Sequence, residues 1–215
     1  MATFNRTDDH GNSRQLPVTG FVLVGGQSRR MGRDKALLEL DGEPLFLRTA
    51  KLLKPYASDV VLLGPTERFS RFGLPVWDDV YPGRGPVGAL YTALRNSHSD
   101  WNLFFACDLP FLNSSILEIL LLRVRNTTAH AVVPKVGERW QPLCAAYHRN
   151  CLSVIEPLIL RADDLSLVGL LSKFPVEVVS PRQSQNAGEW ENLFSNVNTA
   201  EEWEHAQRSA GPVRT

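Results

Sequence analysis

The sequence lacks the long apolar segments and the paired cysteines that mark membrane proteins and disulfide scaffolds. No apolar run approaches the ~20 residues that a membrane-spanning helix needs, so no membrane association is expected. The three cysteines, Cys107, Cys144 and Cys151, form no C-x-x-C pair, and an odd number in a long chain does not indicate a disulfide framework. A reducing cytoplasm is therefore the expected compartment.

The sequence also lacks an excess of charge of either sign. Lysine plus arginine and aspartate plus glutamate both number 23, so the formal net charge is zero. Nucleic-acid-binding domains are usually basic, and this balance argues against a general nucleic-acid binder. Any anion-binding site in this chain must therefore come from local clustering of cations.

The two ends of the chain lack the patterns of a signal peptide or of a packed element. Residues 1–15 are polar and contain no apolar h-region, so they are not a secretory signal. We expect residues 1–17 to be a disordered lead-in and residues 208–215 to be a disordered tail. Residues 18–207 contain no internal repeat and are enough for a single domain with a full core.

Apolar runs and helical patterns alternate along the first half of the domain. The runs at residues 21–24, 59–64 and 101–107 are typical of strands buried on both faces. Helical patterns lie between them, one of them at residues 44–53. This order predicts βαβ units and therefore an α/β fold, a three-layer, doubly wound arrangement with a mostly parallel sheet.

The second half of the domain has a more mixed pattern. Residues 129–136 and 141–147 are expected to pair as an antiparallel hairpin around the bend at Gly137-Glu138. Two helices and a late strand at residues 176–179 follow. The polar residues 183–191 are expected to form a mobile loop.

Glycines and cations follow the first apolar run directly. Gly25 and Gly26 end the run, and glycines at such a point let the backbone approach a ligand closely. The cations that follow are Arg29, Arg30, Arg33 and Lys35. Backbone N–H groups in such a loop, together with these cations, favour an anion site, and a polyphosphate fits it best.

Two familiar phosphate-binding motifs do not fit this loop. The spacing of G-x-x-x-x-G-K-[ST] is not met, because five residues separate Gly26 from Gly32 and Arg33-Asp34 precede the lysine. The dinucleotide fingerprint G-x-G-x-x-G fails because the first two glycines are adjacent. The alternative interpretation is an ordinary strand-to-helix turn with a solvated basic rim, which the clustering of cations disfavours.

Acidic residues follow two further apolar runs. Asp78 and Asp79 open a loop rich in proline and glycine, and such loops bind ligands at the carboxyl ends of strands. Asp108 directly follows a strongly apolar run. It could cap the next helix, but Asn113 and Ser114 are better placed for that. A carboxylate at this point suits Mg²⁺, which takes one or two carboxylates plus substrate phosphates.

The chain ends with a capping pattern and two asparagines. Thr199 as N-cap, with Glu202 three residues later, forms a capping box. That pattern does not account for Asn196 and Asn198, whose amides can donate and accept hydrogen bonds to a ligand. On an extended segment their spacing places both amides on one face.

These motifs resemble those of the molybdenum cofactor guanylyltransferases, which belong to the nucleotidyltransferases with a Rossmann-like core. The loop is similar to the signature L-[AX]-G-G-x-S-x-R-M-G-x-D-K at Gly25, Gly26, Ser28, Arg30, Met31, Gly32, Asp34 and Lys35. Val24 stands where the family usually has alanine. Cytidylyl and sugar-phosphate relatives usually carry L-A-A-G and lack the Met-Gly-x-Asp-Lys ending, so they fit less well.

The resemblance implies roles for individual residues. Lys35, Asp108 and Arg30 are implied as catalytic, and Asp108 as the ligand of a Mg²⁺ cofactor. The implied nucleotide-binding residues are Leu23, Val24, Gly25, Gly26, Ser28, Lys35, Asp78, Gly85 and Asp108. The implied acceptor-binding residues are Gln141, Pro142, Asn196 and Asn198. Leu63 stands where some relatives have an asparagine that touches the nucleotide. Arg139 and Trp140 serve either the acceptor or only the turn.

The activity that the resemblance implies is transfer of GMP from GTP to the terminal phosphate of the molybdenum-pterin cofactor. The products would be the guanine dinucleotide cofactor and pyrophosphate, and molybdoenzymes or their chaperones would be further partners. A related cytidylyltransferase or sugar-phosphate nucleotidyltransferase is one alternative. A non-catalytic pterin carrier is another, although a carrier would not require both Lys35 and Asp108.

Overall fold

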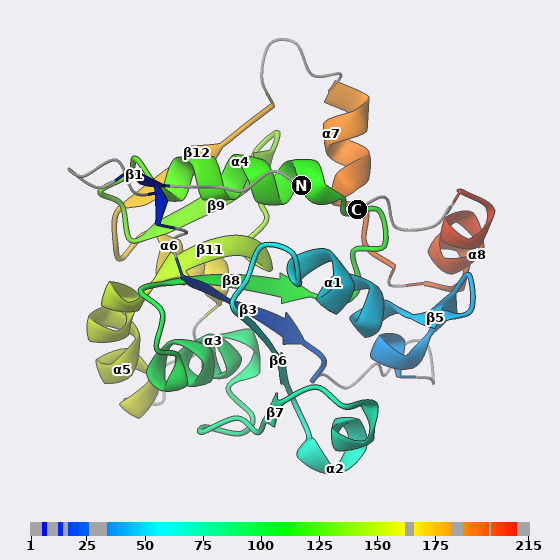
Figure 1. Cartoon of the computed structure of the whole chain (residues 1–215), viewed down its shortest axis with the longest axis horizontal. Helices are drawn as coiled ribbons and strands as arrows, with labels where there is room; N and C mark the ends of the chain where they lie inside the picture. Colours follow the sequence, from blue (N-terminus) through cyan, green and yellow to red (C-terminus); the bar gives the residue numbers. More distant parts are fainter. Residues whose placement is uncertain are drawn as a thin grey trace.

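The fold is built on one mixed sheet of eight strands. The computed structural model describes residues 6–7, 13–14, 17–25, 34–161, 166–181, 187–197 and 199–209. The strand order is β10-β9-β11-β8-β3-β6-β7, and β12 pairs with the other side of β9 (Figure 1). The strands are β3 (Val18–Leu23), β6 (Asp59–Leu63), β7 (Val76–Trp77), β8 (Trp101–Ala106), β9 (Ala131–Val136), β10 (Arg139–Trp140), β11 (Cys144–His148) and β12 (Val176–Val179).

Strand direction divides the sheet into two parts. β8, β3, β6 and β7 run parallel to one another, so their carboxyl ends meet at one edge of the sheet. β11 runs antiparallel to both β8 and β9, and β12 runs parallel to β9. The sheet is therefore mostly parallel, as the alternation of strands and helices predicts.

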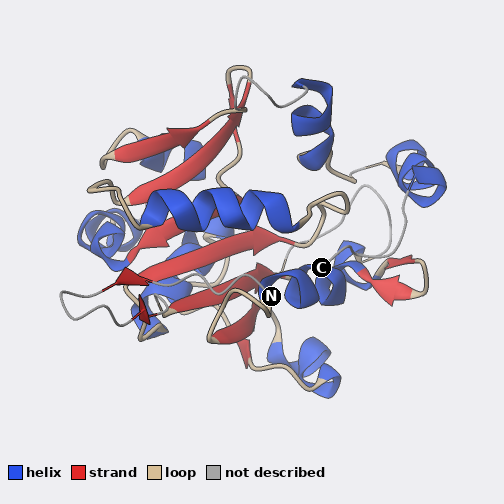
Figure 2. Ribbon diagram, turned by 45° about the horizontal axis from the view of Figure 1, so that its top comes forward, coloured by secondary structure: helices blue, strands red, loops and turns tan. Residues whose placement is uncertain are grey.

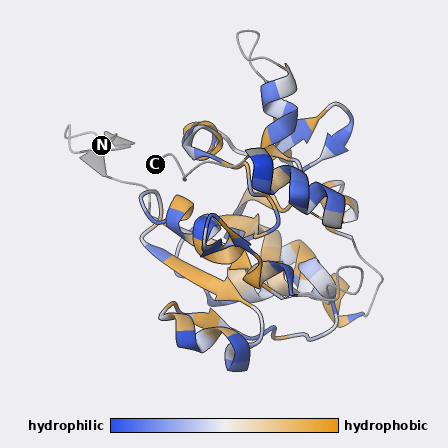
Figure 3. Cartoon of the chain, turned by 90° about the vertical axis from the view of Figure 1, so that its right-hand side faces the viewer, coloured by the Kyte–Doolittle hydropathy of each residue, from blue (hydrophilic) through white to orange (hydrophobic). Residues whose placement is uncertain are grey.

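Helices cover both faces of the sheet (Figures 1 and 2). Residues of α1 (Leu45–Leu53), α4 (Ser114–Val124) and α7 (Ala187–Leu193) belong to one buried cluster. Residues of α3 (Gly85–Asn96), α5 (Leu152–Leu160) and α6 (Leu167–Leu171) belong to another. Alternate side chains of β8 enter different clusters, Leu103 and Phe105 the first and Phe104 the second. Figure 3 shows these central strands as the hydrophobic interior.

Shorter elements complete the chain. They are β1 (Arg6–Thr7), β2 (Ser13–Arg14), η1 (Lys35–Leu37), β4 (Glu39–Leu40), β5 (Glu43–Pro44), α2 (Thr66–Phe69), η2 (Ser70–Phe72), η3 (Arg149–Cys151) and α8 (Ala200–Ser209). β1 and β2 form an antiparallel pair within the segment expected to be a disordered lead-in. Among the described helices, none combines the length and the apolar composition needed to cross a membrane.

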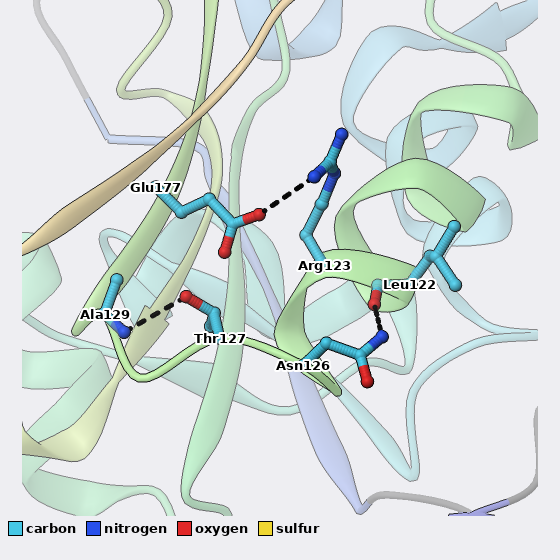
Figure 4. A network of polar contacts seen from close by, with 6 residues as sticks. All are labelled: Leu122, Arg123, Asn126, Thr127, Ala129 and Glu177. Carbon is cyan, nitrogen blue, oxygen red and sulfur yellow. Dashed lines mark hydrogen bonds and ion pairs between the residues drawn. The ribbon is translucent and has the colours of Figure 1, made fainter.

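Polar contacts fix both ends of α4. The Asn113 side chain accepts a hydrogen bond from Ser115 N at 3.0 Å, which confirms it as the cap and leaves Asp108 available for another role. At the other end, Arg123 pairs with Glu177 of β12 at 3.3 Å (Figure 4). This pair ties the last turn of α4 to the edge of the sheet.

One expectation for the second half of the domain needs correction and another is confirmed. Residues 187–193 form α7 instead of a mobile loop, because Trp190 is buried and its Nε1 donates to Lys135 O at 2.8 Å. Residues 182–186 lie outside the described chain. The expected antiparallel pairing is confirmed: the bend at Gly137-Glu138 joins β9 to the short antiparallel strand β10, and β11, which begins at Cys144, also pairs antiparallel with β9.

His148 is expected to make stability depend on pH. Burial is the main cause that lowers its pKa, and the charges of His130 and Arg149 lower it further, against a raising effect of Asp100. The unfolded chain therefore binds the proton more tightly. The contribution of His148 to the free energy of unfolding is complete above its unfolded pKa of about 6.5. It is lost as the pH falls through the pKa of His148 in the folded chain.

Urea unfolding between about pH 7.5 and about pH 5.5 tests this expectation. Replacing His148 by Asn should flatten the decline of the unfolding free energy on the acid side. The matched control is His98→Asn, since His98 is an exposed histidine of the loop before β8. A wild-type decline that persists unchanged in His148→Asn would contradict the assignment to this side chain.

Candidate active site

Two adjoining cavities lie at the carboxyl ends of the parallel strands. The glycine cavity, of about 730 Å³, is lined by Leu23, Gly25, Gly64, Pro65, Arg68, Asp78, Asp79, Pro82, Gly83, Gly85 and Pro86. The Asp108 cavity, of about 230 Å³, is lined by Leu23, Val24, Gly25, Asp34, Lys35, Ala36, Pro86, Ala106, Cys107, Asp108 and Leu143. The two adjoin, because Leu23, Gly25 and Pro86 line both.

The backbone approaches itself closely at the floor of the glycine cavity. Val24 N and Gly25 N both donate to Leu63 O, at 2.9 and 3.1 Å. A Cβ on Gly64 would lie 2.8 Å from Gly25 N and 2.9 Å from Val24 Cγ2. Glycine at position 64 therefore permits the end of β6 to lie against the loop that follows β3.

The two adjacent carboxylates of the glycine cavity are in different environments. Asp78 Oδ1 accepts from Thr66 N at 3.0 Å and Asp78 Oδ2 from Thr66 Oγ1 at 2.6 Å, and these bonds lower its pKa. Among the described residues, Asp79 Oδ1 is buried and has no hydrogen-bond partner, and burial, with the Asp78 charge, raises the pKa of Asp79. Asp79 Oδ1 can therefore accept a hydrogen bond from a ligand. Both carboxylate oxygens of Asp78 are already hydrogen-bonded to Thr66, the first residue of α2.

Asp108 and Lys35 come together in the Asp108 cavity. Burial raises the pKa of Asp108, and the positive charge of Lys35 partly offsets that effect. Lys35 belongs to η1, which Asp34 caps by accepting from Ala36 N at 3.1 Å. The second carboxylate oxygen of Asp34 pairs with Arg68, which also lines the glycine cavity. The pair therefore links η1 to the glycine cavity.

The third cavity lies beside the β9–β10 hairpin and is called the hairpin cavity. It measures about 900 Å³ and is lined by Phe111, Glu138, Arg139, Trp140, Gln141, Val168, Glu191, Phe194, Ser195, Asn196, Val197, Glu201, Glu202 and His205. Val197 N donates to Asp108 O at 3.0 Å. The segment that lines the hairpin cavity is thereby joined to the residue at the centre of the Asp108 cavity.

Comparison with known proteins identifies the family. The family model described as "MobA-like NTP transferase domain" matches residues 20–183. The chain belongs to the MobA-like NTP transferase family. It is 33% identical to a probable molybdenum cofactor guanylyltransferase of Pelotomaculum thermopropionicum, over 93% of this chain and 97% of that protein. It is also 33% identical to a protein of the same name from Clostridium perfringens, over 88% of this chain and 96% of that protein.

Solved structures give the same result for the fold. Molybdopterin-guanine dinucleotide biosynthesis protein A of Archaeoglobus fulgidus is 25% identical, with a TM-score of 0.76 over 88% of this chain and 97% of that one. The 4-diphosphocytidyl-2C-methyl-D-erythritol synthase of Anaerococcus prevotii has a TM-score of 0.67 at 11% identity, over 91% of this chain and 98% of that one. At that identity the comparison shows the fold alone. The chain is thus a MobA-like nucleotidyltransferase.

The cavities of this MobA-like domain bring together most of the residues singled out from the sequence. Leu23, Val24, Gly25, Lys35 and Asp108 line the Asp108 cavity; Asp78 and Gly85 line the glycine cavity; Gln141 and Asn196 line the hairpin cavity. Pro142 lines none of the three, and its carbonyl accepts from Tyr147 Oη at 2.8 Å. Gly26, Ser28, Arg30 and Asn198 lie outside the described residues.

Sequence reasoning missed two residues of the glycine cavity. Asp79 was visible only as the second of two acids, and which acid is already hydrogen-bonded depends on Thr66, a residue of another element. Arg68 gave no signal, because it reaches the cavity from a helix of only four residues. Leu63 is fully buried, so its side chain offers no contact to a ligand.

The Asp108 cavity fits a magnesium ion held jointly with a substrate. Among the described residues there is no cluster of three or more histidine, cysteine or acidic side chains able to hold a metal alone. Mg²⁺ is usually held by one or two carboxylates together with substrate phosphates and water. Asp108 is a partly buried carboxylate beside a lysine that can meet a phosphate, which suits that mode of binding. The second carboxylate of the cavity, Asp34, already pairs with Arg68.

Substituting Gly64 by alanine is expected to damage both stability and ligand binding. The new Cβ would displace the Gly25 backbone, so the loss of unfolding free energy should exceed ~1 kcal/mol. Gly73→Ala is the matched control, because Gly73 has φ +76° but nothing lies within 4 Å of the position that a Cβ would occupy there. Urea unfolding and nucleotide titration would measure both effects. Equal losses in the two variants, with unchanged nucleotide affinity, would contradict the close-approach argument.

Proposed function

We propose that this chain transfers GMP from GTP to the terminal phosphate of the molybdenum-pterin cofactor, with Mg²⁺ as cofactor. The central supporting observation is the position of Asp108. Its side chain lines a cavity that adjoins the glycine cavity, and its carbonyl oxygen binds Val197 of the hairpin cavity. One residue thus lies between a candidate nucleotide site and a candidate acceptor site. The names of the curated relatives support the choice of both substrates.

The glycine cavity is the proposed site of the nucleoside. Its volume of about 730 Å³ suits a nucleoside, and its glycines let the ligand approach the backbone. A carboxylate accepts paired hydrogen bonds from guanine N1–H and the 2-amino group, which cytosine and adenine cannot offer in that pattern. Asp79 is the better candidate for this contact, since both oxygens of Asp78 already bind Thr66. Leu23, Val24, Gly25 and Gly85 would enclose the nucleotide, with Gly26 and Ser28 continuing the loop.

The chemistry needs no protein nucleophile. An oxygen of the acceptor phosphate attacks the α-phosphorus of GTP, the α–β bridging P–O bond breaks, and pyrophosphate leaves. Lys35, with Arg30 of the adjoining loop, would balance the charge of the triphosphate and hold it in line with the attacking oxygen. Asp108 would hold Mg²⁺, which when bound neutralises charge on the phosphates.

The hairpin cavity is the proposed site of the pterin. Gln141 and Asn196 present amides that can donate to and accept from the polar edges of a pterin. Pro142 would act by shaping the loop next to Gln141, and Asn198 is proposed as a second amide on the Asn196 segment. Trp140 offers an aromatic face in the same cavity, although Lys135 already lies 4.8 Å from its ring centre.

Compartment and partners follow from the same proposal. All three cysteines are buried and free, which fits a reducing cytoplasm. The product would pass to molybdoenzymes or to their chaperones. A non-catalytic carrier fits less well, because the domain brings Lys35 and Asp108 into one cavity.

Product identification tests the proposal directly. The purified chain is incubated with Mg²⁺, the pterin cofactor and GTP, or with CTP or ATP in place of GTP, and the products are separated and weighed by mass spectrometry. The guanine dinucleotide cofactor and pyrophosphate are expected when GTP is the nucleotide, and no dinucleotide is expected with CTP or ATP. Equal use of CTP would overturn the guanylyl assignment, and pterin binding without turnover would favour the carrier. Asp79→Asn should lower the affinity for GTP more than Asp78→Asn does.

A further inference from the structure

The last helix, α8, forms one wall of the hairpin cavity. Glu201, Glu202 and His205 of α8 line that cavity, and His205 lies edge-on to Phe111 with ring centres 6.4 Å apart. The start of the helix is fixed by a reciprocal cap. Thr199 N donates to Glu202 Oε2 at 2.9 Å, and Glu202 N donates to Thr199 Oγ1 at 3.2 Å. The shape of the cavity therefore depends on where α8 lies.

Few apolar contacts hold α8 against the domain. Among its residues with a described side chain, only Ala206 is fully buried, and Trp203 is the large apolar one. Trp203 packs against a small cluster formed by Leu38, Leu40 and Leu45, which is separate from the two main clusters of the domain. Figure 1 shows α8 near β5, which lies in the chain between Leu40 and Leu45 of this cluster. The indole is thus the large apolar side chain through which α8 packs on this cluster.

The cluster beneath Trp203 directly continues the segment that carries Lys35. Leu38 is the C-cap of η1, and its backbone N–H donates to Lys35 O at 3.1 Å. Leu38 O in turn accepts from Leu45 N at 2.9 Å, at the start of α1. Trp203 therefore packs on the residues that follow η1, whereas the start of η1 at Lys35 is fixed separately by the Asp34 cap.

We infer that Trp203 is a positioning residue for the acceptor. By docking α8 on the Leu38, Leu40 and Leu45 cluster, it sets the width of the hairpin cavity. It also sets the position of that cavity relative to the Asp108 cavity. Trp203 does not line the hairpin cavity, so it acts through Glu201, Glu202 and His205. The inference rests on the proposed function, because it takes the occupant of the hairpin cavity to be the pterin acceptor.

Truncating Trp203 should loosen α8 without unfolding the sheet, since the cluster it covers lies outside the two main cores. The KM of the pterin acceptor is expected to rise between about tenfold and about 10²-fold, the scale of a positioning defect remote from the chemistry. The KM of GTP should stay within about twofold, because no α8 residue lines the glycine cavity. Trp203→Phe should recover most of the loss, because a smaller ring can still cover the leucines.

The experiment compares wild type, Trp203→Ala, Trp203→Phe and Glu204→Ala in the full-length chain. Glu204 is the matched control, since it is exposed on the same helix and, within the described part of the chain, its one ion pair is with Arg208 at 3.8 Å. Hydrogen exchange of residues 199–209 measures docking of α8, and steady-state kinetics with the pterin cofactor and GTP measures each KM. Faster exchange and a higher acceptor KM in Trp203→Ala alone would support the inference.

Three other results would overturn it. Faster exchange with an unchanged acceptor KM would show that α8 docking does not matter to the acceptor. Equal rises in the KM of GTP and of the acceptor would indicate general disorder of the domain. Unchanged exchange would show that Trp203 does not dock the helix. Failure of the proposed function is distinguishable, because wild type would then form no dinucleotide product at all.

Discussion

Replacing Asp108 by asparagine is expected to lower Mg²⁺-dependent turnover by about 10²-fold or more, the scale of losing one electrostatic stabiliser. The amide keeps the shape of the side chain but removes the charge that would hold the metal. The backbone bond from Val197 N to Asp108 O does not involve the side chain, so the hairpin cavity should remain attached. The pterin KM should therefore change little while kcat falls.

Stability should not fall with activity in this variant. Burial raises the pKa of Asp108, which means that the folded chain disfavours the ionised carboxylate relative to the unfolded chain. The neutral asparagine avoids that cost at neutral pH. The midpoint of thermal unfolding is therefore expected to equal or exceed that of wild type, which separates a catalytic defect from a folding defect.

A control variant and a metal titration complete the test. Asp59→Asn removes an exposed carboxylate from the amino end of β6, another parallel strand of the sheet, and should retain wild-type turnover. Raising the Mg²⁺ concentration should not restore Asp108→Asn to the wild-type kcat. Turnover near the wild-type rate at matched Mg²⁺ would eliminate Asp108 as the metal ligand.

The central sheet could be predicted because its sequence pattern has a direct physical cause. Strands buried on both faces need continuous apolar runs, and β3, β6 and β8 have them. Their carboxyl ends must then meet at one edge, so Gly25 and Asp108 could be placed together from the sequence alone. The capping roles of Asn113 and Thr199 were predictable for the same reason, because a cap is a local contact.

Features that depend on contacts between distant elements could not be predicted. α7 looks polar in sequence, and it is held by Trp190 against Lys135, fifty-five positions earlier in the chain. The choice between Asp78 and Asp79 depends on Thr66, and the role of Arg68 depends on Asp34. In each case a single side chain contacts a partner that is distant in the sequence. The sheet topology brings the two together, and a local sequence pattern does not predict such a contact.

Replacing Lys35 by methionine is expected to lower kcat/KM for GTP by between about 10² and about 10³, as for loss of a preorganised charge at a phosphoryl centre. Methionine has a similar length and no charge. Lys35 lines the Asp108 cavity and lowers the pKa of Asp108 through its positive charge, so the two groups act on each other electrostatically. Removing the cation leaves the triphosphate less well neutralised, and both GTP affinity and kcat should fall.

The control for this variant is Lys54→Met, which removes an exposed lysine at the C-cap of α1 and should leave kcat/KM within about twofold of wild type. Lys35→Arg distinguishes a simple charge effect from a geometric one. It should recover only part of the activity, because a planar guanidinium cannot occupy the position of an ammonium group in so small a cavity. A Lys35→Met variant with the wild-type kcat/KM would exclude Lys35 from the phosphate site.

A double-mutant cycle with Asp108→Asn and Lys35→Met tests whether the two residues serve one transition state. Groups that act as a unit have strongly non-additive effects, because removing the first already disables what the second contributes. The double variant is therefore expected to be only slightly slower than the worse single variant. Independent sites would instead multiply the two losses. A multiplicative result would mean that Lys35 binds the triphosphate away from the metal and that the Asp108 cavity does not hold both groups around the reacting phosphate.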